Sequence, residues 1–462
     1  MMPTSQLPEA FTARLGQMLG ERFSTSMALR QQHGRDESIF PATLPDAVAY
    51  ARDTAEVAEI VQLCGTFNIP VIPYAAGSSL EGHTLAVHGG LTLNLMQMNG
   101  ILGINAEDQT ATVQPGVTRE ALNAALRDTG LFFPVDPGAD ASIGGMCSTR
   151  ASGTNAVRYG TMRENVVSLT AIVASGDIVK TGRRAKKSAA GYDLTRLFVG
   201  AEGTLGIIVE ATVRLHPLPE STMAAVCAFP DIDAAVQSVV QIVQLGVPVA
   251  RCEFVDPVAI KALNVYSKTG LPEQPHLFFE FHGSQSGLKE QIALVQDITQ
   301  DHGAASFVWS ASPEERSRLW AARHNVYFAA SQLRPGARSV VTDVCVPISR
   351  LADCVNETIQ DLRESQILAP VVGHVGDGNF HVQMLVDGAS QDEIDGAEAL
   401  NARLVSRALS MDGTCTGEHG IGLHKQGFLI DELGSASVNV MRQIKQALDP
   451  RNIMNPGKIF SL

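Results

Sequence analysis

Three stretches of small residues interrupt the strands and helices predicted for the first half of the chain, and they limit the folds that this half can adopt. They cover residues 75–83 (A-A-G-S-S-L-E-G-H), 134–160 and 200–206 (G-A-E-G-T-L-G). Because small residues leave backbone N–H groups uncovered, such loops can bind an anion such as a diphosphate. The second stretch is too long and too rich in turn-forming residues to be one linker. Together the three loops fit one large, extended cofactor better than a single phosphate group.

The pattern around these loops predicts more than one domain of mixed helices and strands. A helix over 55–67 and a strand over 70–74 open the first half, and Gly176-Asp177 indicates a hairpin. From residue 221 onward strands and helices alternate, which is typical of a separate domain. No G-x-G-x-x-G follows a predicted strand and no G-x-x-x-x-G-K-S/T occurs, which disfavours a Rossmann nicotinamide site and a P-loop. At 462 residues, two or three domains are expected.

The overall charge argues against general nucleic-acid binding. The formal net charge is −13, and the basic cluster is confined to residues 183–187 (R-R-A-K-K), whereas binding to a phosphate backbone requires clustered Lys and Arg. A solvated loop explains this cluster better than a site for a phosphate or an acidic partner. The hydrophobic fraction of 45% and the charged fraction of 18% are those of a globular protein.

The cysteines and the N-terminal sequence indicate the cellular compartment in which the protein is expected. The seven cysteines are scattered and no C-x-x-C occurs, which favours reduced thiols. Cys415 is interpreted as a buried filler rather than a metal ligand. The N-terminus lacks a basic region followed by an apolar run, and no apolar run reaches the ~18 residues of a membrane span. We therefore expect a soluble, cytoplasmic protein, with peripheral contact to the inner membrane left open.

Two glycine-rich segments in the second half contain residue types that bind metals. Residues 372–383 (V-G-H-V-G-D-G-N-F-H-V-Q) contribute His374 and His381, and residues 413–422 (G-T-C-T-G-E-H-G-I-G) contribute Glu418 and His419. Two imidazoles and one carboxylate match a three-ligand site for a divalent ion, and His419 is then a candidate base. Alternatively, these are hydrogen-bonded histidines in ordinary tight turns. The spacing alone does not decide between the two.

Six motifs, in order, resemble those of the FAD-linked D-lactate and D-2-hydroxy acid dehydrogenases of the vanillyl-alcohol-oxidase superfamily. This group includes the glycolate oxidase flavoprotein subunit and D-2-hydroxyglutarate dehydrogenase. The motifs are A-A-G-S-S-L-E-G-H, D-P-G-A-D-A-S-I-G-G-M, G-A-E-G-T-L-G-I, G-H-V-G-D-G-N-F-H, G-T-C-T-G-E-H-G-I-G and D-P-R-N-I-M-N-P-G-K. The resemblance extends from about Pro41 to Phe460.

The resemblance implies an α+β fold with three parts. Residues 1–40 would form an N-terminal helical segment. Residues 41–219 would form a two-lobed FAD-binding domain of the PCMH type. Residues 220–462 would form a C-terminal substrate or cap domain, with an antiparallel sheet covered by helices, and residues 413–462 would return to the flavin.

The resemblance also implies FAD and the residues that contact it. The loop after residue 74 would hold the diphosphate, residues 137–155 would line the flavin and its ribityl chain, and residues 202–207 would lie at the adenine end. Some relatives attach the flavin covalently through a histidine near the diphosphate loop, where this chain has His83, but this group generally binds FAD non-covalently. The implied FAD contacts, among which Asn455 would return to the isoalloxazine ring, are Ala76, Gly77, Ser78, Ser79, Leu80, Pro137, Gly138, Ser142, Gly144, Gly145, Ser148, Gly153, Asn155, Glu202, Gly203, Gly206, Ile207 and Asn455.

Metal-containing members of the group bind Zn or Mn through the motif residues that here are His374, His381 and Glu418. His419 would be the catalytic base. Arg323, otherwise an ordinary surface salt-bridge residue, would bind the substrate carboxylate, and Gln383 would also contact the substrate. D-2-hydroxyglutarate dehydrogenases tend to have a lysine where this chain reads Val341-Thr342-Asp343, which favours a monocarboxylate.

The implied reaction is oxidation of D-lactate or a related D-2-hydroxy acid to the 2-oxo acid. The α-hydrogen would leave as hydride to flavin N5, and a cytochrome, a quinone or an electron-transfer flavoprotein would accept the electrons. Three alternatives remain: a glycolate oxidase subunit that needs partner subunits, a metal-dependent hydrolase with the same three ligands, and a flavin-binding subunit without activity. The sequence leaves a homodimer as an open expectation.

Overall fold

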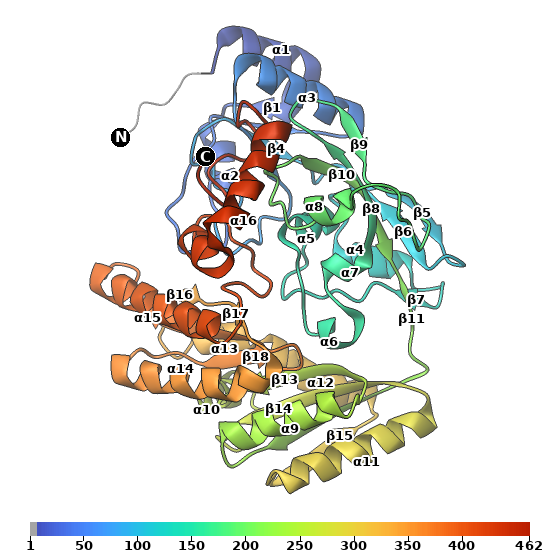
Figure 1. Cartoon of the computed structure of the whole chain (residues 1–462), viewed down its shortest axis with the longest axis vertical. Coiled ribbons are helices and arrows are strands. Elements are labelled where there is room, and N and C mark those ends of the chain that lie inside the picture. The colour runs from blue at the N-terminus through green and yellow to red at the C-terminus, as the bar shows by residue number, and fades with distance from the viewer. Residues whose placement is uncertain (1–6) are drawn as a thin grey trace. The chain divides into compact units, whose positions relative to one another are not determined.

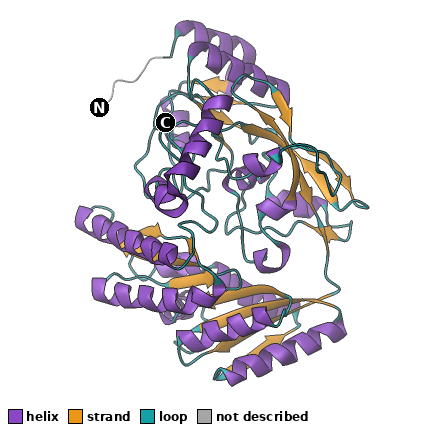
Figure 2. Ribbon diagram, in the orientation of Figure 1, coloured by secondary structure: helices purple, strands orange, loops and turns teal. Residues whose placement is uncertain are grey.

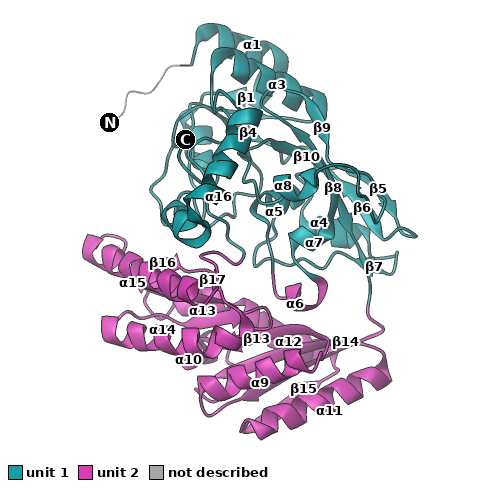
Figure 3. Cartoon of the chain, viewed as in Figure 1, with its two compact units in different colours: residues 1–152, 160–218, 418–462 teal, residues 153–159, 219–417 magenta. Residues whose placement is uncertain are grey.

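The computed structural model describes residues 7–462 and divides the chain into two compact units (Figures 1 and 3). Unit 1 comprises residues 1–152, 160–218 and 418–462, and unit 2 comprises residues 153–159 and 219–417. Helices and strands are mixed in both units (Figure 2), which confirms the predicted α+β class. Residues 1–6, which belong to the expected N-terminal helical segment and to the region without a predicted signal, lie outside the described residues.

The first sheet of unit 1 is built around a parallel β–α–β unit. Strands β2 (Ala47–Tyr50) and β3 (Val71–Tyr74) both pair in parallel with β4 (Leu91–Asn94), and β1 (Phe23–Ser24) pairs antiparallel with β2. Helix α3 (Thr54–Phe67) connects β2 to β3. Asp53 begins this helix by accepting the Glu56 N–H at 2.9 Å. The helix buries an i, i+3, i+4, i+7 stripe that consists of Val57, Ile60, Val61 and Cys64.

The second sheet of unit 1 is antiparallel, in the order β5-β6-β10-β8-β9. Its strands are β5 (Ile101–Asn105), β6 (Thr110–Val113), β8 (Val166–Ile172), β9 (Ile178–Lys180) and β10 (Ile207–Arg214). β8 and β9 form the hairpin predicted at Gly176-Asp177. The remaining elements of unit 1 are α1 (Glu9–Leu19), α2 (Met27–His33), α4 (Arg119–Ala125), β7 (Leu131–Phe132), α5 (Ile143–Thr149), α7 (Met162–Asn165), α8 (Leu194–Phe198), β11 (His216–Pro217) and α16 (Gln426–Leu448).

Unit 2 contains one eight-stranded sheet in which every pairing is antiparallel. Seven strands follow the order β15-β12-β14-β13-β18-β19-β16, and β17 also pairs with β19. They are β12 (Ser221–Ala228), β13 (Val249–Val255), β14 (His276–Gly283), β15 (Ser306–Ser310), β16 (Arg338–Val341), β17 (Val344–Cys345), β18 (Val371–His374) and β19 (Asn379–Val386). The helices are α6 (Ala156–Tyr159), α9 (Ile232–Gln244), α10 (Pro257–Tyr266), α11 (Gln285–Asp301), α12 (Pro313–His324), α13 (Val326–Ser331), α14 (Leu351–Ser365) and α15 (Gln391–Ser410).

Strand β14 explains why helices must cover this sheet on both faces. Phe278, Phe279 and Phe281 are at most 1% exposed, and successive residues of a strand point to opposite faces. Burying one such side chain stabilises the fold by about 1.5–3 kcal/mol. The predicted antiparallel sheet covered by helices is therefore confirmed.

Candidate functional site

The loop that follows β3 presents backbone donors that the protein itself does not use. Within residues 7–462, the N–H groups of Ala76, Gly77, Ser78 and Ser79 donate to no protein acceptor. Gly77 has a φ of +71°, and a Cβ there would lie 2.2 Å from Tyr74 Oη, so glycine is required. A run of such N–H groups suits an anion, and this loop therefore fits the diphosphate of FAD.

His83 lies beside this loop, and a polar protein atom lies near each of its ring nitrogens. Nδ1 contacts the Ser79 hydroxyl, and Nε2 lies 3.2 Å from Glu202 Oε2. The ring is buried with its residue, which is 5% exposed. These contacts give His83 a structural role and favour FAD that is not attached through this histidine.

The second small-residue region contains positions of two kinds. Ser142 begins α5 by accepting the Gly145 N–H at 3.2 Å, and the Ser148 hydroxyl donates to Gly144 O at 2.8 Å. A Cβ on Gly144 would lie 2.5 Å from Pro115 Cβ, whereas a Cβ on Gly138, which follows Pro137, would meet nothing within 4 Å. Gly144 is therefore needed for packing, and Gly138 borders open space that a ligand can fill.

This difference allows the cofactor cradle to be tested with two glycine variants. We expect Gly144→Ala to destabilise the FAD-free protein by about 1–3 kcal/mol through overpacking. Gly138→Ala should leave that stability unchanged but weaken FAD binding by about tenfold, or ~1.4 kcal/mol. Thermal unfolding of FAD-free protein and titration of flavin fluorescence measure the two effects. Unchanged FAD affinity in Gly138→Ala would remove this position from the cradle.

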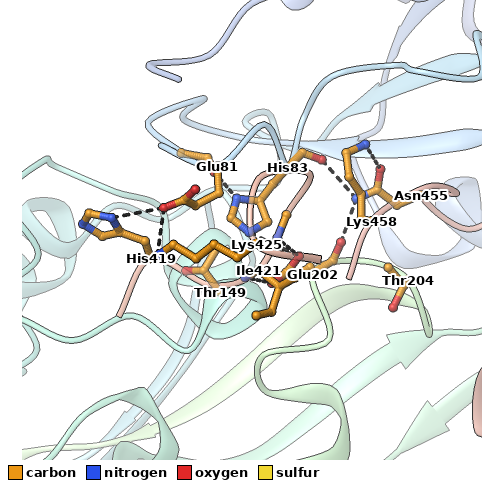
Figure 4. Close-up of polar contacts among 12 residues, drawn as sticks. Glu81, His83, Thr149, Glu202, Thr204, His419, Ile421, Lys425, Asn455 and Lys458 are labelled. Atoms are coloured by element: carbon orange, nitrogen blue, oxygen red, sulfur yellow. Dashed lines mark hydrogen bonds and ion pairs between the residues drawn. The ribbon is translucent and has the colours of Figure 1, made fainter. Parts of the chain in front are cut away.

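The third region surrounds Glu202 and ties the C-terminal segment of unit 1 to its core (Figure 4). Glu202 Oε1 accepts the Ile421 N–H at 2.7 Å, and Oε2 accepts the Gly422 N–H at 2.9 Å. Asn455, which is 1% exposed, donates through Nδ2 to the carbonyls of His83 and Glu202. The side-chain nitrogen of Asn455 is thus engaged by protein groups.

The other residues predicted at the adenine end also have packing roles. Gly203 has a φ of +74°, and a Cβ there would lie 2.4 Å from the Pro73 ring. A Cβ on Gly206 would lie 2.8 Å from Ile172 O, and Ile207 is 1% exposed in the core of unit 1. Their contacts explain these residues without a ligand.

His419 lies beside a second buried carboxylate in unit 1 (Figure 4). Glu81 is 1% exposed, and its Oε1 lies 3.4 Å from His419 Nδ1 and 3.1 Å from Lys425 Nζ. His424 Nδ1 lies 2.9 Å from Glu81 Oε2. Burial by itself raises the pKa of Glu81, but Lys425 and the two histidines outweigh burial and hold that pKa well below its ordinary value. Glu81 is therefore an ionised partner for His419.

Unit 2 brings His374 and His381 together across the neighbouring strands β18 and β19. Their ring centroids are 5.5 Å apart with the rings nearly perpendicular, and one ligand atom of each lies within 4.8 Å of the other. His374 Nδ1 contacts Glu253 Oε1 at 2.8 Å, and His381 Nδ1 contacts Thr342 O at 3.0 Å. An imidazole that donates through Nδ1 presents Nε2 as its ligand atom, with the other nitrogen fixed by an outer partner. The donor set therefore fits a divalent ion.

Arg323 projects from α12 toward the same region of unit 2. It is 8% exposed, and its Nη2 donates to Glu253 Oε2 at 2.5 Å. Among the described residues, its buried Nε has no hydrogen-bond partner. Burial by itself raises the pKa of Glu253, but the neighbouring His374 and Arg323 keep that pKa below its ordinary value. Arg323 thus combines a fixed guanidinium with an unused donor.

Gln383 and Asn155 both lie in unit 2 and make protein contacts there. Gln383 Nε2 contacts Tyr327 O, Ser331 Oγ and Ser339 Oγ at 2.9–3.2 Å. The side-chain oxygen Oε1 of Gln383 takes no part in these bonds. Asn155 Oδ1 accepts from Arg251 Nε at 3.1 Å, and Asn155 and Gly153 belong to the short segment 153–159 of unit 2.

Sequence reasoning missed Glu81 and Glu253, the two buried carboxylates that contact the candidate site residues. Glu81 was visible as the acidic residue of the first glycine-rich loop, and Glu253 as an acidic residue inside an apolar strand. Cys415 is fully buried, as expected of a filler. In residues 7–462, no helix combines the length and apolar character needed to cross a bilayer.

Two family models match the chain in sequence. The FAD binding domain matches residues 45–182, and the C-terminal domain of FAD linked oxidases matches residues 218–459. A relative from Danio rerio, named probable D-lactate dehydrogenase, mitochondrial, is 51% identical, and the alignment covers 96% of this chain and 90% of the relative. A relative from Arabidopsis thaliana, named D-lactate dehydrogenase (cytochrome), mitochondrial, is 43% identical, with 98% and 81% covered. Glycolate oxidase subunit GlcD from Bacillus subtilis is 36% identical, with 96% and 94% covered.

Solved structures share the fold at low sequence identity. p-Cresol methylhydroxylase with bound substrate superimposes with a TM-score of 0.81 at 17% identity, covering 98% of this chain and 96% of that one. Alkyldihydroxyacetonephosphate synthase gives a TM-score of 0.75 at 20% identity, covering 97% and 84%.

The expectation of a cytoplasmic protein is wrong. Relatives from Danio rerio, Arabidopsis thaliana, Kluyveromyces lactis and Saccharomyces cerevisiae, which are 51%, 43%, 40% and 39% identical, are all named as mitochondrial. Reduced, scattered cysteines do not distinguish the cytoplasm from another reducing compartment.

Proposed function

The chain belongs to the family of FAD-linked oxidases, and on this premise we propose that it oxidises D-lactate, or a closely related D-2-hydroxy acid, to the 2-oxo acid. The observation that carries the proposal is in unit 2, where Glu253 contacts both His374 and Arg323 and where Thr342 O anchors Nδ1 of the neighbouring His381. The names of four relatives at 39–51% identity support D-lactate as the substrate.

Residues around His381 support a substrate with a single carboxylate. Thr342 and Asp343 are each 1% exposed, and both serve protein contacts. The Thr342 hydroxyl accepts the Val382 N–H at 3.0 Å, and Asp343 Oδ1 accepts from Asn379 Nδ2 at 2.8 Å. The two positions before Asp343 carry no cation that would pair with a second, distal carboxylate.

Arg323 and the two histidines would hold the substrate. The unused Nε of Arg323 would donate to the carboxylate of D-lactate while Glu253 keeps the guanidinium in place. His374 and His381 would each contribute Nε2 to a divalent ion, Zn or Mn. When bound, such an ion polarises the hydroxyl of a 2-hydroxy acid and lowers its pKa.

Chain connectivity supports Glu418 as a further ligand beside these histidines. Thr416 Oγ1 donates to Asp343 Oδ2 at 2.8 Å, and a Cβ on Gly417 would lie 2.3 Å from Asn379 Nδ2. Unit 2 therefore fixes the backbone up to Gly417, and Glu418 follows one trans peptide, ~3.8 Å, further on. We propose Glu418 as the third ligand on this ground.

His419 would take the hydroxyl proton. Its Nδ1 faces the ionised Glu81, and we therefore assign Nε2 as the nitrogen that receives the proton. Bound FAD would be the oxidant and would take up the C2 hydrogen as hydride. The loop of residues 76–79 would bind the FAD diphosphate without a covalent link. A cytochrome as electron acceptor is supported by the names of the plant and yeast relatives.

An anaerobic visible spectrum of purified protein tests this function. We expect a flavin band that D-lactate bleaches and L-lactate does not. Bleaching by glycolate in preference to D-lactate would favour a glycolate oxidase subunit, as in the Bacillus subtilis relative. A stable flavin band with every 2-hydroxy acid would identify a flavin-binding subunit without this activity. A protein that stays colourless even after FAD is added would favour the alternative function of a metal-dependent hydrolase.

Removal of the ion tests the metal separately from the flavin. We expect dialysis against dipicolinate to leave FAD bound but to slow bleaching by D-lactate at least ~100-fold, because the hydroxyl pKa is no longer lowered. Added Zn or Mn should restore the rate. If the metal-free protein is reduced as fast as the untreated protein, D-lactate oxidation does not depend on this ion.

A further inference from the structure

Glu253 is the buried residue that joins the two functional groups of unit 2. It is 0% exposed, and each carboxylate oxygen has one partner: Oε1 contacts His374 Nδ1 at 2.8 Å and Oε2 contacts Arg323 Nη2 at 2.5 Å. The three residues come from β13, β18 and α12. A single carboxylate therefore links a proposed metal ligand to the proposed substrate arginine.

The strand register produces half of this arrangement. β13 and β18 pair antiparallel with Phe254 opposite Gly373, so the same register places Glu253 opposite His374. Directly opposite residues of an antiparallel pair project to the same face. Helix α12 contributes Trp320 to the cluster that covers the sheet near β13, and Arg323 follows Trp320 by three residues, about one turn along the same side of the helix.

We propose that Glu253 is a positioning residue that sets the affinity for the divalent ion through His374 and the affinity for the substrate carboxylate through Arg323. This inference rests on the proposed function. Glu253 holds the proton on His374 Nδ1, which keeps Nε2 as the ligand atom. It also anchors Arg323 through Nη2, which leaves Nε available to donate to the substrate. Neither role requires Glu253 to touch the ion or the substrate.

The substitution Glu253→Gln separates these roles from simple packing. Glutamine has nearly the same shape, but its amide offers one acceptor where the carboxylate offers two. It can accept from His374 or from Arg323, and its NH₂ group then faces the other donor. We expect ion affinity to fall by about 10–100-fold, the usual effect of losing such an outer partner. With the ion kept saturating, KM for D-lactate should still rise by about tenfold or more through Arg323.

Glu280 provides a matched control in the neighbouring strand. It is 6% exposed, its Oε1 contacts His282 Nε2 at 2.9 Å, and Arg251 Nε lies 3.6 Å away. It therefore also lies between a histidine and an arginine, but neither partner is a proposed ligand. Glu280→Gln should keep the wild-type ion affinity and KM.

The experiment measures FAD content, Zn or Mn affinity by titration of metal-free protein, and KM for D-lactate at saturating ion. FAD binding reports that unit 1 is folded in each variant, and the circular dichroism spectrum and thermal unfolding report whether unit 2, which contains both substitutions, is folded. Weaker ion binding and higher KM in Glu253→Gln, but not in Glu280→Gln, support the inference. Wild-type values in Glu253→Gln, or equal losses in both variants, overturn it. If Glu253→Gln does not fold, Glu253→Asp replaces it in the experiment. The shorter side chain keeps the charge but reaches only one partner. The same results for ion affinity and KM then support or overturn the inference.

The wild-type protein distinguishes a failed inference from a failed function. Wild-type protein that binds the ion and is bleached by D-lactate, together with an unchanged Glu253→Gln variant, refutes the positioning role alone. Wild-type protein that binds neither Zn nor Mn refutes the proposed ion and, with it, the role of Glu253 toward His374.

Discussion

His419→Ala should retain FAD and lose nearly all reduction of the flavin by D-lactate. A general base contributes about 10²–10⁴ to the rate, and we expect a loss in that range in an anaerobic stopped-flow experiment. FAD should stay bound because Glu81, the carboxylate beside His419, keeps Lys425 at 3.1 Å and His424 at 2.9 Å after the ring is removed. Added imidazole should recover part of the rate by filling the space of the lost side chain.

His424→Ala is the matched control for this variant. His424 contacts the other oxygen of the same carboxylate, so both variants remove one histidine from Glu81. Only His419 is proposed to receive the substrate proton, and His424→Ala should stay within a few-fold of the wild-type rate. Rapid reduction in His419→Ala, or equal losses in the two variants, would show that His419 is not the base.

The local sequence pattern predicted those helices and strands whose stabilising contacts lie within the same short segment of the chain. Helix α3 has its cap, its apolar stripe and its left-handed end within residues 53–68. The sequence pattern over residues 314–332 predicts one helix, but the structure has two there, because α12 ends at His324 and α13 begins at Val326. The pattern over residues 340–347 likewise predicts one strand, but the structure has β16 and β17, separated by Thr342 and Asp343, whose side chains contact Val382 and Asn379. Pairwise contacts of this kind are not visible in a one-dimensional pattern.

Other elements were hidden by their composition. Strand β19 was interpreted only as a glycine-rich site segment, yet residues 379–386 are all buried between β18 and β16. For helix α16 the sequence pattern predicts only residues 438–448, but the helix begins at Gln426 and contains a kink at Gly434, whose φ is 77°. Glycine at the kink interrupts the apolar pattern from which the helix was predicted.

The residues of the candidate site show the same difference between local pattern and long-range contact. Histidines bracketed by glycines were proposed as site residues from the sequence because their residue types and neighbours are unusual. Glu253 was not, because its partners Arg323 and His374 lie 70 and 121 residues away in the chain. Glu81 meets His424 across 343 residues. The resemblance supplied the roles of the histidines, whereas only the strand register and helix packing identify the carboxylates that hold them.

Asp449→Asn should be the most destabilising single substitution among those considered in unit 1. Lys445, which is 3% exposed, donates through Nζ to Asp449 Oδ2 at 2.5 Å and to the carbonyls of Thr204 and Met454 at 2.8 Å. Asp449 also accepts the N–H groups of Ile453 and Met454. Removing one partner of a buried ion pair leaves an uncompensated charge and costs about 3–5 kcal/mol. Thermal unfolding, followed by circular dichroism, measures the loss.

The pH dependence shows whether charge or packing causes that loss. Burial lowers the pKa of Lys445, and Asp449 opposes this shift, so Asp449→Asn should lower that pKa further. When the folded pKa lies below the unfolded value of ~10.4, the unfolded state binds more protons between the two values, and stability rises with pH through that window. The loss of unfolding free energy caused by Asp449→Asn should therefore become smaller between neutral pH and about pH 10. Asp53→Asn, which keeps an equally good cap on α3, should show no deficit at either pH, and a pH-independent loss in Asp449→Asn would identify packing as its cause.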